Sequence, residues 1–190
     1  MSVLAATSQV ALWVLVVLQG LVLLGLTRAV YRLQQSGGSG GDPPARNSER
    51  LVGRRAPEFV AVDVLGRPVA SSDLWGRLTA LLFVSPHCSN CAVTLDELEG
   101  LKAKVNGNVV VVCVADTEES RNVAEDYGLS VPVVADPEER ITRLYDVAGT
   151  PAAVLVGKGG RVLQYGSPSR ADDLEEMMRE PQPAAAEDAR

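Results

Sequence analysis

The sequence predicts an α/β fold, with a central mixed sheet flanked by helices, preceded by a single N-terminal transmembrane helix. Three observations lead to it. Short apolar runs alternate with amphipathic segments over residues 78–145, a hairpin pattern follows at 152–165, and residues 2–27 carry no charged side chain. Alternation is typical of parallel strands joined by helices, and a hairpin adds antiparallel strands at one end of the sheet.

The apolar N-terminal run is long enough to cross a membrane, since about 20 apolar residues span a bilayer as a helix. A cleaved signal peptide is the alternative, but no Lys or Arg precedes the run and no small-x-small cleavage site closes it. We therefore expect residues 1–33 to form a retained anchor. Arginines follow the run, so the positive-inside rule favours a cytoplasmic domain, although long domains can be exported despite such charges.

The remaining chain divides by composition into three parts. Residues 34–50 are rich in Gly, Ser and Pro, which predicts a flexible linker. Residues 51–180 carry the periodic apolar patterns and are expected to form one folded domain. Residues 181–190 are rich in Pro, Ala and Glu, which predicts a disordered tail.

The first half of the folded domain presents the most regular pattern. Residues 59–64 are typical of a short strand pair or edge strand that turns at Gly66, and a capped turn is expected at 72–74. The continuous apolar run 78–84 indicates a strand buried on both faces. A single helix is expected over 90–104, because Leu95, Leu98, Leu101 and Val105 share one helical face.

The second half repeats the alternation. We expect a last helix opened by a capping box of Ser169 and Asp172, with Leu174, Met177 and Met178 on its buried side. The other expected elements are strand 109–114, helix 118–127, strand 131–135, helix 138–145 with Ile141, Leu144 and Tyr145 inward, and the hairpin strands 152–156 and 161–165.

Two cysteines stand directly after the buried strand. Cys88 and Cys91 would lie on the first turn of the following helix, close enough for their sulfurs to form a disulfide. The N–H groups and the positive end of the helix dipole stabilise a thiolate there. Cys88 is therefore expected to be the nucleophile, and Cys91 the resolving thiol that releases the partner.

His87 is the third candidate catalytic residue. A protonated imidazole would favour the Cys88 thiolate, and a neutral one could transfer a proton. The alternative is a surface residue that only shapes the exit from the strand. Metal binding by His87 and the two cysteines is disfavoured because they make a poor tetrahedral ligand set.

Two further positions stand out. Thr150-Pro151 at the start of a strand fits a cis peptide bond, with an ordinary trans proline as the alternative. Cys113 lies in a valine-rich run and is expected to be a small buried hydrophobe. The net charge of −6 argues against nucleic acid as the main partner.

The chain resembles the thioredoxin superfamily, and specifically its membrane-anchored TlpA/ResA-like branch. Residues 53–59, 83–91, 149–151 and 157–162 carry the resemblance, which covers about 51–179. Within this branch, the anchor and the Ser-Pro-His-Cys sequence are most similar to MauD-type methylamine-utilisation accessory proteins. The resemblance implies a thioredoxin-like fold that exchanges disulfides with proteins outside the cytoplasm, and a substrate-binding role for Thr150 and Pro151.

The sequence departs from these relatives around the cysteines. The buried acid of thioredoxins falls on Leu82, and the glutamate of the ResA-like helix falls on Thr94. Deprotonation of Cys91 would then rely on water, His87 or another group. The peroxiredoxin pattern fails as well, because the proline that it needs seven residues before the reactive cysteine is Leu81 for Cys88 and Val84 for Cys91.

The expected function is that of a membrane-tethered thiol–disulfide oxidoreductase, which needs no cofactor or metal. Its partners would be protein thiols or disulfides and a membrane or soluble electron donor. Since disulfides persist outside the cytoplasm, the redox domain is expected on the extracytoplasmic face of the cell membrane. The alternative is a non-catalytic assembly or metal-delivery factor on the same fold.

Overall fold

The computed structural model describes Gln19, residues 50–102 and residues 104–181. The chain divides into two compact units, Met1–Gly41 and Asp42–Arg190, and the elements described below belong to the second. The predicted anchor, linker and tail lie outside the described residues, apart from Gln19 and one residue at each domain boundary. In the described part of the chain, no helix has the length and apolar character needed to cross a membrane.

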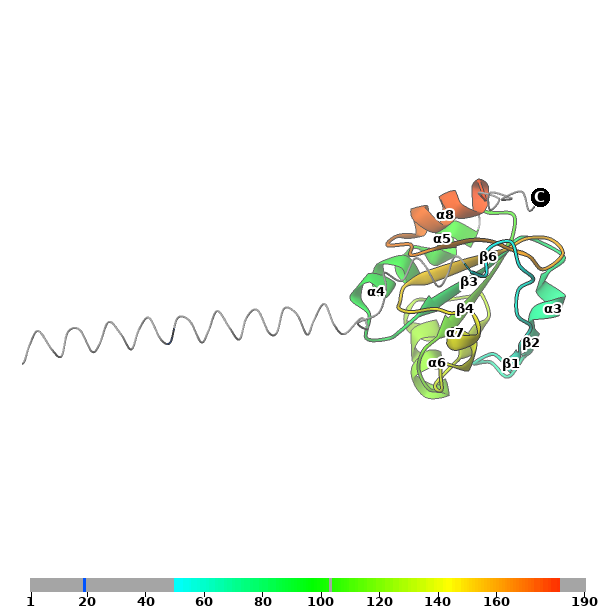
Figure 1. Cartoon of the computed structure of the whole chain (residues 1–190). Helices are drawn as coiled ribbons and strands as arrows, with labels where there is room; N and C mark the ends of the chain where they lie inside the picture. The colour runs from blue at the N-terminus through cyan, green and yellow to red at the C-terminus, as the bar shows by residue number, and fades with distance from the viewer. Residues whose placement is uncertain (1–18, 20–49, 103, 182–190) are drawn as a thin grey trace, which may run out of the picture. The chain divides into compact units, whose positions relative to one another are not determined.

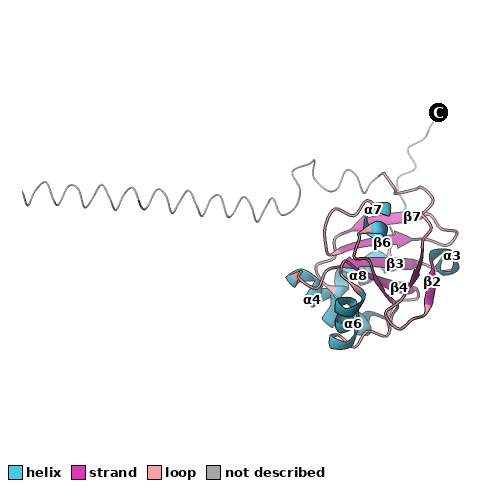
Figure 2. Ribbon diagram, turned by 90° about the horizontal axis from the view of Figure 1, so that it is seen from below, coloured by secondary structure: helices cyan, strands magenta, loops and turns pink. Residues whose placement is uncertain are grey.

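A five-stranded mixed sheet forms the centre of the domain, in the order β5-β4-β3-β6-β7 (Figures 1 and 2). β3 pairs in parallel with β4, and β4 with β5, whereas β6 runs antiparallel to β3 and to β7. The predicted mixed sheet is confirmed, with its antiparallel strands at one end. The strands are β3 Thr79–Val84, β4 Asn108–Cys113, β5 Val133–Ala135, β6 Ala152–Val156 and β7 Val162–Gly166.

Smaller elements complete the fold. A separate two-stranded antiparallel sheet precedes the main one, as the pattern around Gly66 predicts; its strands are β1 Val60–Val62 and β2 Pro68–Ala70. The helices are α3 Ser71–Leu74, α4 Ser89–Asp96, α5 Leu98–Lys102, α6 Thr117–Asp126, α7 Arg140–Leu144 and α8 Ala171–Arg179.

Each face of the sheet carries its own apolar core, because successive side chains of a strand point to opposite faces. Leu82 and Val84 of β3 belong to one core, which also contains apolar residues of α4, α5, α6 and α8. Leu81 and Phe83 belong to the other, with residues of α7 and of the segment before β3. All six residues of β3 are buried. The uninterrupted apolar pattern of this strand therefore reflects burial on both faces, as predicted.

The prediction of a single helix over 90–104 is wrong, because this segment forms two helices. It is divided at Glu97 into α4 and α5. The Glu97 carboxylate accepts hydrogen bonds from the Arg170 side chain at 3.2 Å and from the Ala171 backbone N–H at 3.3 Å. Glu97 thus connects to the start of α8, and this tertiary contact accompanies the break in a pattern that is locally helical.

Two finer expectations are also corrected. Leu144 was expected to point inward, but it is 42% exposed, because α7 ends there and only Ile141 and Tyr145 reach the core. The N-terminus of α8 uses Asp173 rather than Asp172. The Asp173 carboxylate accepts hydrogen bonds from the backbone N–H groups of Ser169 and Arg170, at 2.8 and 3.1 Å.

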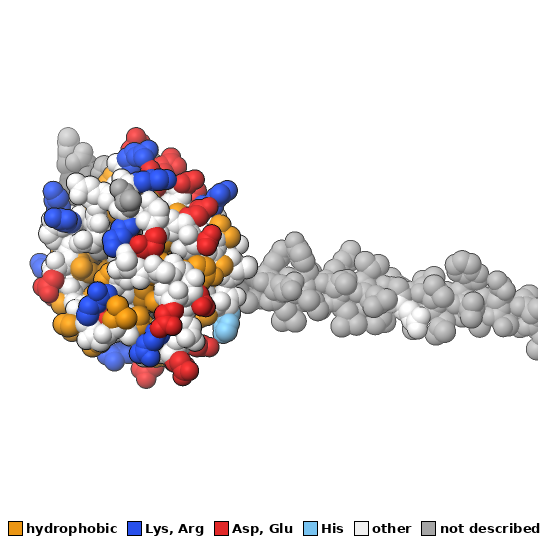
Figure 3. All heavy atoms as spheres, turned by 180° about the vertical axis from the view of Figure 1, so that it is seen from behind, with side chains coloured by type: hydrophobic (Ala, Val, Ile, Leu, Met, Phe, Trp, Pro, Cys, Tyr) orange, Lys and Arg blue, Asp and Glu red, His pale blue; other side chains and the backbone are white. Residues whose placement is uncertain are grey.

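Charge on the surface is mixed. Figure 3 shows acidic and basic side chains interspersed on the face that it displays, with apolar atoms between them. Exposed apolar side chains of the described residues include Val60, Val62 and Leu65 near β1.

Asp63 supports the turn between β1 and β2. Its buried carboxylate accepts hydrogen bonds from the backbone N–H groups of Leu65 and Arg67, at 3.0 and 2.8 Å, and from the Arg67 guanidinium at 2.6 Å. Burial by itself would raise the pKa of Asp63, but the hydrogen bonds and the Arg67 charge together lower that pKa.

The lowered pKa of Asp63 predicts that its contribution to the stability of the fold depends on pH. Because the pKa of Asp63 is lower in the folded state, its stabilising effect is complete above about pH 4, near the unfolded value, and is lost as the pH falls through the folded value. Asp63→Asn should lower the free energy of unfolding by about 1–3 kcal/mol at pH 7, and by less near pH 3. Denaturant unfolding at both pH values tests this, with exposed Asp96→Asn as the control. An equal loss at both pH values would contradict it.

Candidate active site

The two cysteines of the predicted redox pair form a disulfide. The pair lies where β3 passes into α4, two elements that Figure 1 labels. Their Cα atoms are 5.2 Å apart. Cys88 is the N-cap residue of α4, and its sulfur accepts a hydrogen bond from the Cys91 backbone N–H at 3.2 Å. The strand ends at Val84 and the turn 85–87 leads directly to this cap, so the buried strand fixes the position of the pair.

The two sulfur-bearing residues differ in exposure. Cys88 is half-buried, whereas Cys91 is only 1% exposed and belongs to the core beneath α4. The first turn of a helix presents unpaired N–H groups and the positive end of the dipole, both of which stabilise a thiolate. The outer position of Cys88 agrees with attack by its sulfur on a partner, followed by resolution from the inner Cys91.

The peptide bond between Thr150 and Pro151 is cis, as the sequence predicts. The Thr150 carbonyl oxygen lies 3.4 Å from the Cys88 sulfur. Strand pairing explains the proximity: Phe83 of β3 pairs with Ala152 of β6, the residue after the proline. Three of the five predicted site residues, Cys88, Cys91 and Thr150, are thus brought together, with Pro151 adjoining them.

His87 stands on the exposed turn before the cap. Its backbone N–H contacts the Ser85 hydroxyl at 3.4 Å. The side chain is open to solvent, and therefore to an approaching partner.

The two positions where relatives carry an acid are buried and uncharged. Leu82 and Thr94 are both fully buried. The Thr94 hydroxyl lies within hydrogen-bonding distance of two backbone carbonyl oxygens, 3.3 Å from Asn90 and 3.4 Å from Pro168. Neither position places a carboxylate beside Cys91.

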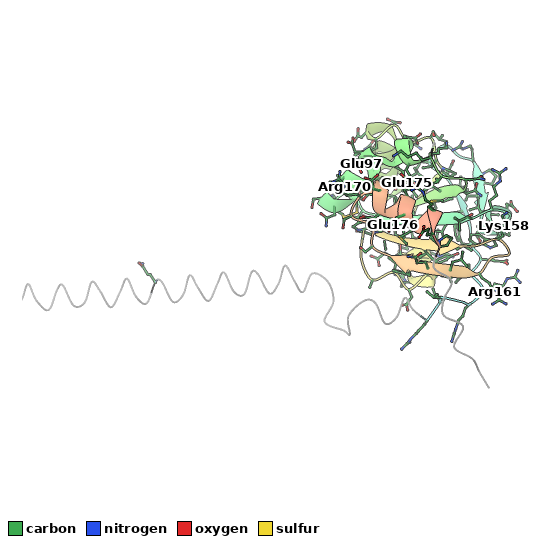
Figure 4. The ribbon with its side chains drawn as sticks, turned by 90° about the horizontal axis from the view of Figure 1, so that it is seen from above. Glu97, Lys158, Arg161, Arg170, Glu175 and Glu176 are labelled. Carbon is green, nitrogen blue, oxygen red and sulfur yellow. A yellow bond between two sulfur atoms is a disulfide. The ribbon has the colours of Figure 1, made fainter. Side chains whose placement is uncertain are left out.

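A loop with no sequence signal of its own links the two halves of the site. In residues 167–170, between β7 and α8, the Ser167 hydroxyl donates a 2.6 Å hydrogen bond to the Pro151 carbonyl oxygen. The same loop reaches α4 through the Pro168 carbonyl, and Arg170 pairs with Glu97 just beyond α4 at 3.2 Å (Figure 4). A serine after a strand carries no local signal for such a contact.

Ser167 is expected to position the proline loop. Ser167→Ala should slow disulfide exchange by about threefold to tenfold, because small displacements of a substrate-positioning group reduce rate strongly. It should lower the free energy of unfolding by only about 1 kcal/mol. Exchange kinetics and denaturant unfolding measure the two effects. Ser167→Thr keeps the hydroxyl and should restore the rate; an unchanged rate in Ser167→Ala would contradict the assignment.

Cys113 lies apart from this chemistry. It is fully buried at the end of β4, and burial raises the pKa of its thiol. Its expected role as a small apolar residue agrees with this position. Among the described residues, no group of three or more His, Cys, Asp or Glu side chains is arranged to hold a metal ion.

A cysteine pair at the start of a helix, beside a cis-proline loop on a mixed sheet, defines a thioredoxin-like thiol–disulfide oxidoreductase. The chain matches the AhpC/TSA family over residues 52–165 and belongs to that family. It is similar to thiol-disulfide oxidoreductase ResA of Bacillus anthracis, with 29% identity over 124 residues that cover 63% of this chain and 72% of the relative. ResA of Geobacillus kaustophilus is 31% identical over 117 residues, 60% of this chain and 67% of the relative.

Solved structures show the same fold. A Chlorobium tepidum protein assigned as a thiol:disulfide interchange protein DsbE is 27% identical, with a TM-score of 0.58 over 67% of this chain and 93% of that one. A secreted disulfide oxidoreductase of Mycobacterium tuberculosis, at 24% identity, has a TM-score of 0.57 over 64% of this chain and 94% of its own. The enzyme is therefore a thiol–disulfide oxidoreductase of the ResA/DsbE type, as the sequence predicts.

Proposed function

We propose that the protein exchanges disulfides with partner proteins through Cys88 and Cys91, with Cys88 as the nucleophile. The observation that carries the proposal is the half-buried Cys88 sulfur, bonded to Cys91 at the N-terminus of α4 and 3.4 Å from the Thr150 carbonyl oxygen. In the reduced enzyme, the Cys88 thiolate attacks a partner disulfide and forms a mixed disulfide, while the first partner thiolate leaves. The Cys91 thiolate then attacks the Cys88 sulfur and releases the second partner thiolate.

The reaction transfers two electrons from the enzyme dithiol to the partner disulfide. The enzyme dithiol becomes the Cys88–Cys91 disulfide, and the partner disulfide becomes a dithiol that takes up two protons; the reverse reaction oxidises a partner. The Thr150 and Pro151 backbone is proposed to contact the partner chain beside the sulfur, as the family resemblance implies. A partner strand could use the carbonyl group of Thr150 as a hydrogen-bond acceptor.

The direct test follows the redox state of the full-length chain in glutathione buffers of stepwise ratio, together with its exchange with a disulfide-bonded test protein. The proposal predicts reversible conversion of one cysteine pair and exchange by the reduced chain. A pair that stays inert over the whole glutathione range would refute it. The alternative, a metal-delivery factor, would instead retain one equivalent of copper or zinc and lose it in Cys91→Ser.

His87 is proposed to assist proton transfer at the Cys88 sulfur. His87→Ala should slow exchange by about tenfold and alter its pH profile, because a positioned acid–base group contributes at least that much to a rate. Rates measured from pH 5 to pH 9 test the role. If the pH dependence of the rate is unchanged in His87→Ala, the residue only shapes the turn before Cys88.

We further propose that the chain is membrane-tethered, with the redox domain on the extracytoplasmic face. The charge-free apolar run 2–27 supports the tether, and the persistence of disulfides outside the cytoplasm supports the orientation, against the arginines that follow the run. An alkaline phosphatase fused after residue 190 should be active only if the domain is exported. An inactive but expressed fusion would contradict the orientation.

From the resemblance to MauD-type proteins, we also propose that a partner of this chain is one of the proteins of methylamine utilisation. The sequence Ser85-Pro86-His87-Cys88 supports it. It predicts that the full chain restores growth on methylamine to a strain that lacks its own MauD-type protein. Failure to restore growth, with exchange activity intact in vitro, would remove this assignment.

A further inference from the structure

A small groove opens beside the Cys88 sulfur, on the side of α4 that faces α6. Its walls are two helical faces at regular spacing: Cys88, Ala92 and Leu95 from the α4 side, and a face of α6 opposite. The residues of the second wall are Glu119, Asn122, Val123, Asp126 and Tyr127, and Ser85 and Pro86 close the end near the cysteine. The volume is about 200 Å³. Pockets for whole small molecules occupy about 300–1,000 Å³, so this groove fits one or two side chains of a polypeptide.

The groove has a mixed polar and apolar lining and an acidic rim. Leu95 and Val123 are buried, whereas Glu119 and Asp126 are exposed and carry no ion-pair partner among the described residues. None of the lining residues is Lys or Arg. The nearby Arg121 is turned away, since its guanidinium donates to the Val64 carbonyl oxygen at 3.3 Å. Two carboxylates without an ion-pair partner among the described residues therefore flank a groove of mixed lining that ends at the Cys88 sulfur.

We infer that this groove receives the segment next to the reacting cysteine of a partner protein, and that it selects a partner in which Lys or Arg flanks that cysteine. The alkyl part of such a side chain can pack against the apolar lining residues on the α4 side, Ala92 and Leu95, while its cationic end reaches the acidic rim. The inference rests on the proposed function, because Cys88 must be the attacking sulfur for the groove to adjoin the substrate. Complementary charge beside the reaction centre raises the rate of productive encounter and disfavours acidic partners.

The test compares the reduction of three peptide homodimers, each joined by one disulfide, by the reduced full-length chain. The peptides are identical except that Lys, Ser or Glu flanks the cysteine, and released thiol peptide is measured by liquid chromatography. The Lys peptide should react about fivefold faster than the Glu peptide at low salt, in the range that two exposed ion pairs provide. The preference should largely disappear at about 1 M salt, where charges are screened beyond about 3 Å.

Matched variants locate the effect on one face of α6. Glu119→Gln with Asp126→Asn should abolish the preference, so that the Lys and Glu peptides react at the same rate. Glu118→Gln with Glu125→Gln changes the net charge of the same helix equally, but neither residue lines the groove, so the preference should remain. If both double variants lose the preference, the preference depends on the overall charge of the chain, and the inferred role of the groove is wrong.

The outcomes also separate the groove from the proposed function. Rapid exchange at equal rates with all three peptides would contradict the inferred role of the groove but would agree with the proposed thiol–disulfide exchange. No reaction with any peptide would overturn both.

Discussion

Replacing Cys88 by serine is expected to reduce exchange with a disulfide substrate by at least about a thousandfold, because a serine hydroxyl at neutral pH is a far weaker nucleophile than a thiolate. Cys91 is only 1% exposed and cannot attack an incoming disulfide from its position in the core. The full-length variant should therefore be folded and inactive. Release of thiol from a disulfide-bonded test protein measures the rate, and circular dichroism verifies folding.

The third cysteine provides the matched control. Cys113→Ser removes a thiol from the same chain, but Cys113 is fully buried at the end of β4 and its pKa is raised by burial. This variant should exchange disulfides at nearly the wild-type rate if it folds; Cys113→Ala keeps the position apolar if the serine variant is unstable. Substantial exchange by Cys88→Ser would contradict the assignment of the nucleophile.

Truncating Phe83 is expected to give the largest loss of stability among the changes considered. Phe83 is fully buried, and its ring lies 5.9 Å from that of Tyr145, whose hydroxyl donates to the Pro57 carbonyl oxygen at 2.6 Å. Phe83→Ala should lower the free energy of unfolding by about 3–5 kcal/mol. A domain of this kind is stable by only about 5–15 kcal/mol in total, so the loss is a large fraction.

Denaturant unfolding of the full-length chain measures this effect, with Val60→Ala as the control. Val60 is 82% exposed, so its truncation should change the free energy by no more than about 0.5 kcal/mol. The Phe83 site also bears on function, because the pairing of Phe83 with Ala152 holds the cysteine turn beside the proline loop. A loss below about 1 kcal/mol in Phe83→Ala would contradict the account of this core.

The sheet and the cysteine turn could be predicted because their signals are local. Strand β3 is buried on both faces, so its apolar run has no interruption, and Cys88 follows within four residues of its end. The alternation of strands and helices then predicts parallel pairing, and the hairpin predicts the antiparallel end. Burial of Cys113 follows from the valine-rich run in the same way.

The errors and omissions come from contacts between distant parts of the chain. Glu97 interrupts the expected helix while it binds the N–H group of Ala171, 74 residues away. The hydrogen bond from Ser167 to Pro151 depends on the β6–β7 pairing, and the groove depends on the packing of α6 beside α4. Periodicity along one segment contains no information about which distant residue will lie against it.

Because Leu82 and Thr94 stand where relatives carry an acid, proton transfer at the cysteine pair depends on groups at the outer edge of the site. Both positions are fully buried and carry no carboxylate that could take a proton from Cys91. A proton would instead reach this pair through water or through the exposed His87. The reduction potential of the pair therefore requires its own measurement.

Trapping a mixed disulfide identifies the nucleophilic cysteine. The reduced full-length Cys91→Ser variant, which retains Cys88 but cannot resolve the intermediate, is incubated with a peptide disulfide, and mass spectrometry of the digested adduct identifies the modified cysteine. We expect a stable adduct on Cys88 and none on Cys113. An adduct on Cys113, or no adduct with a correctly folded protein, would contradict it.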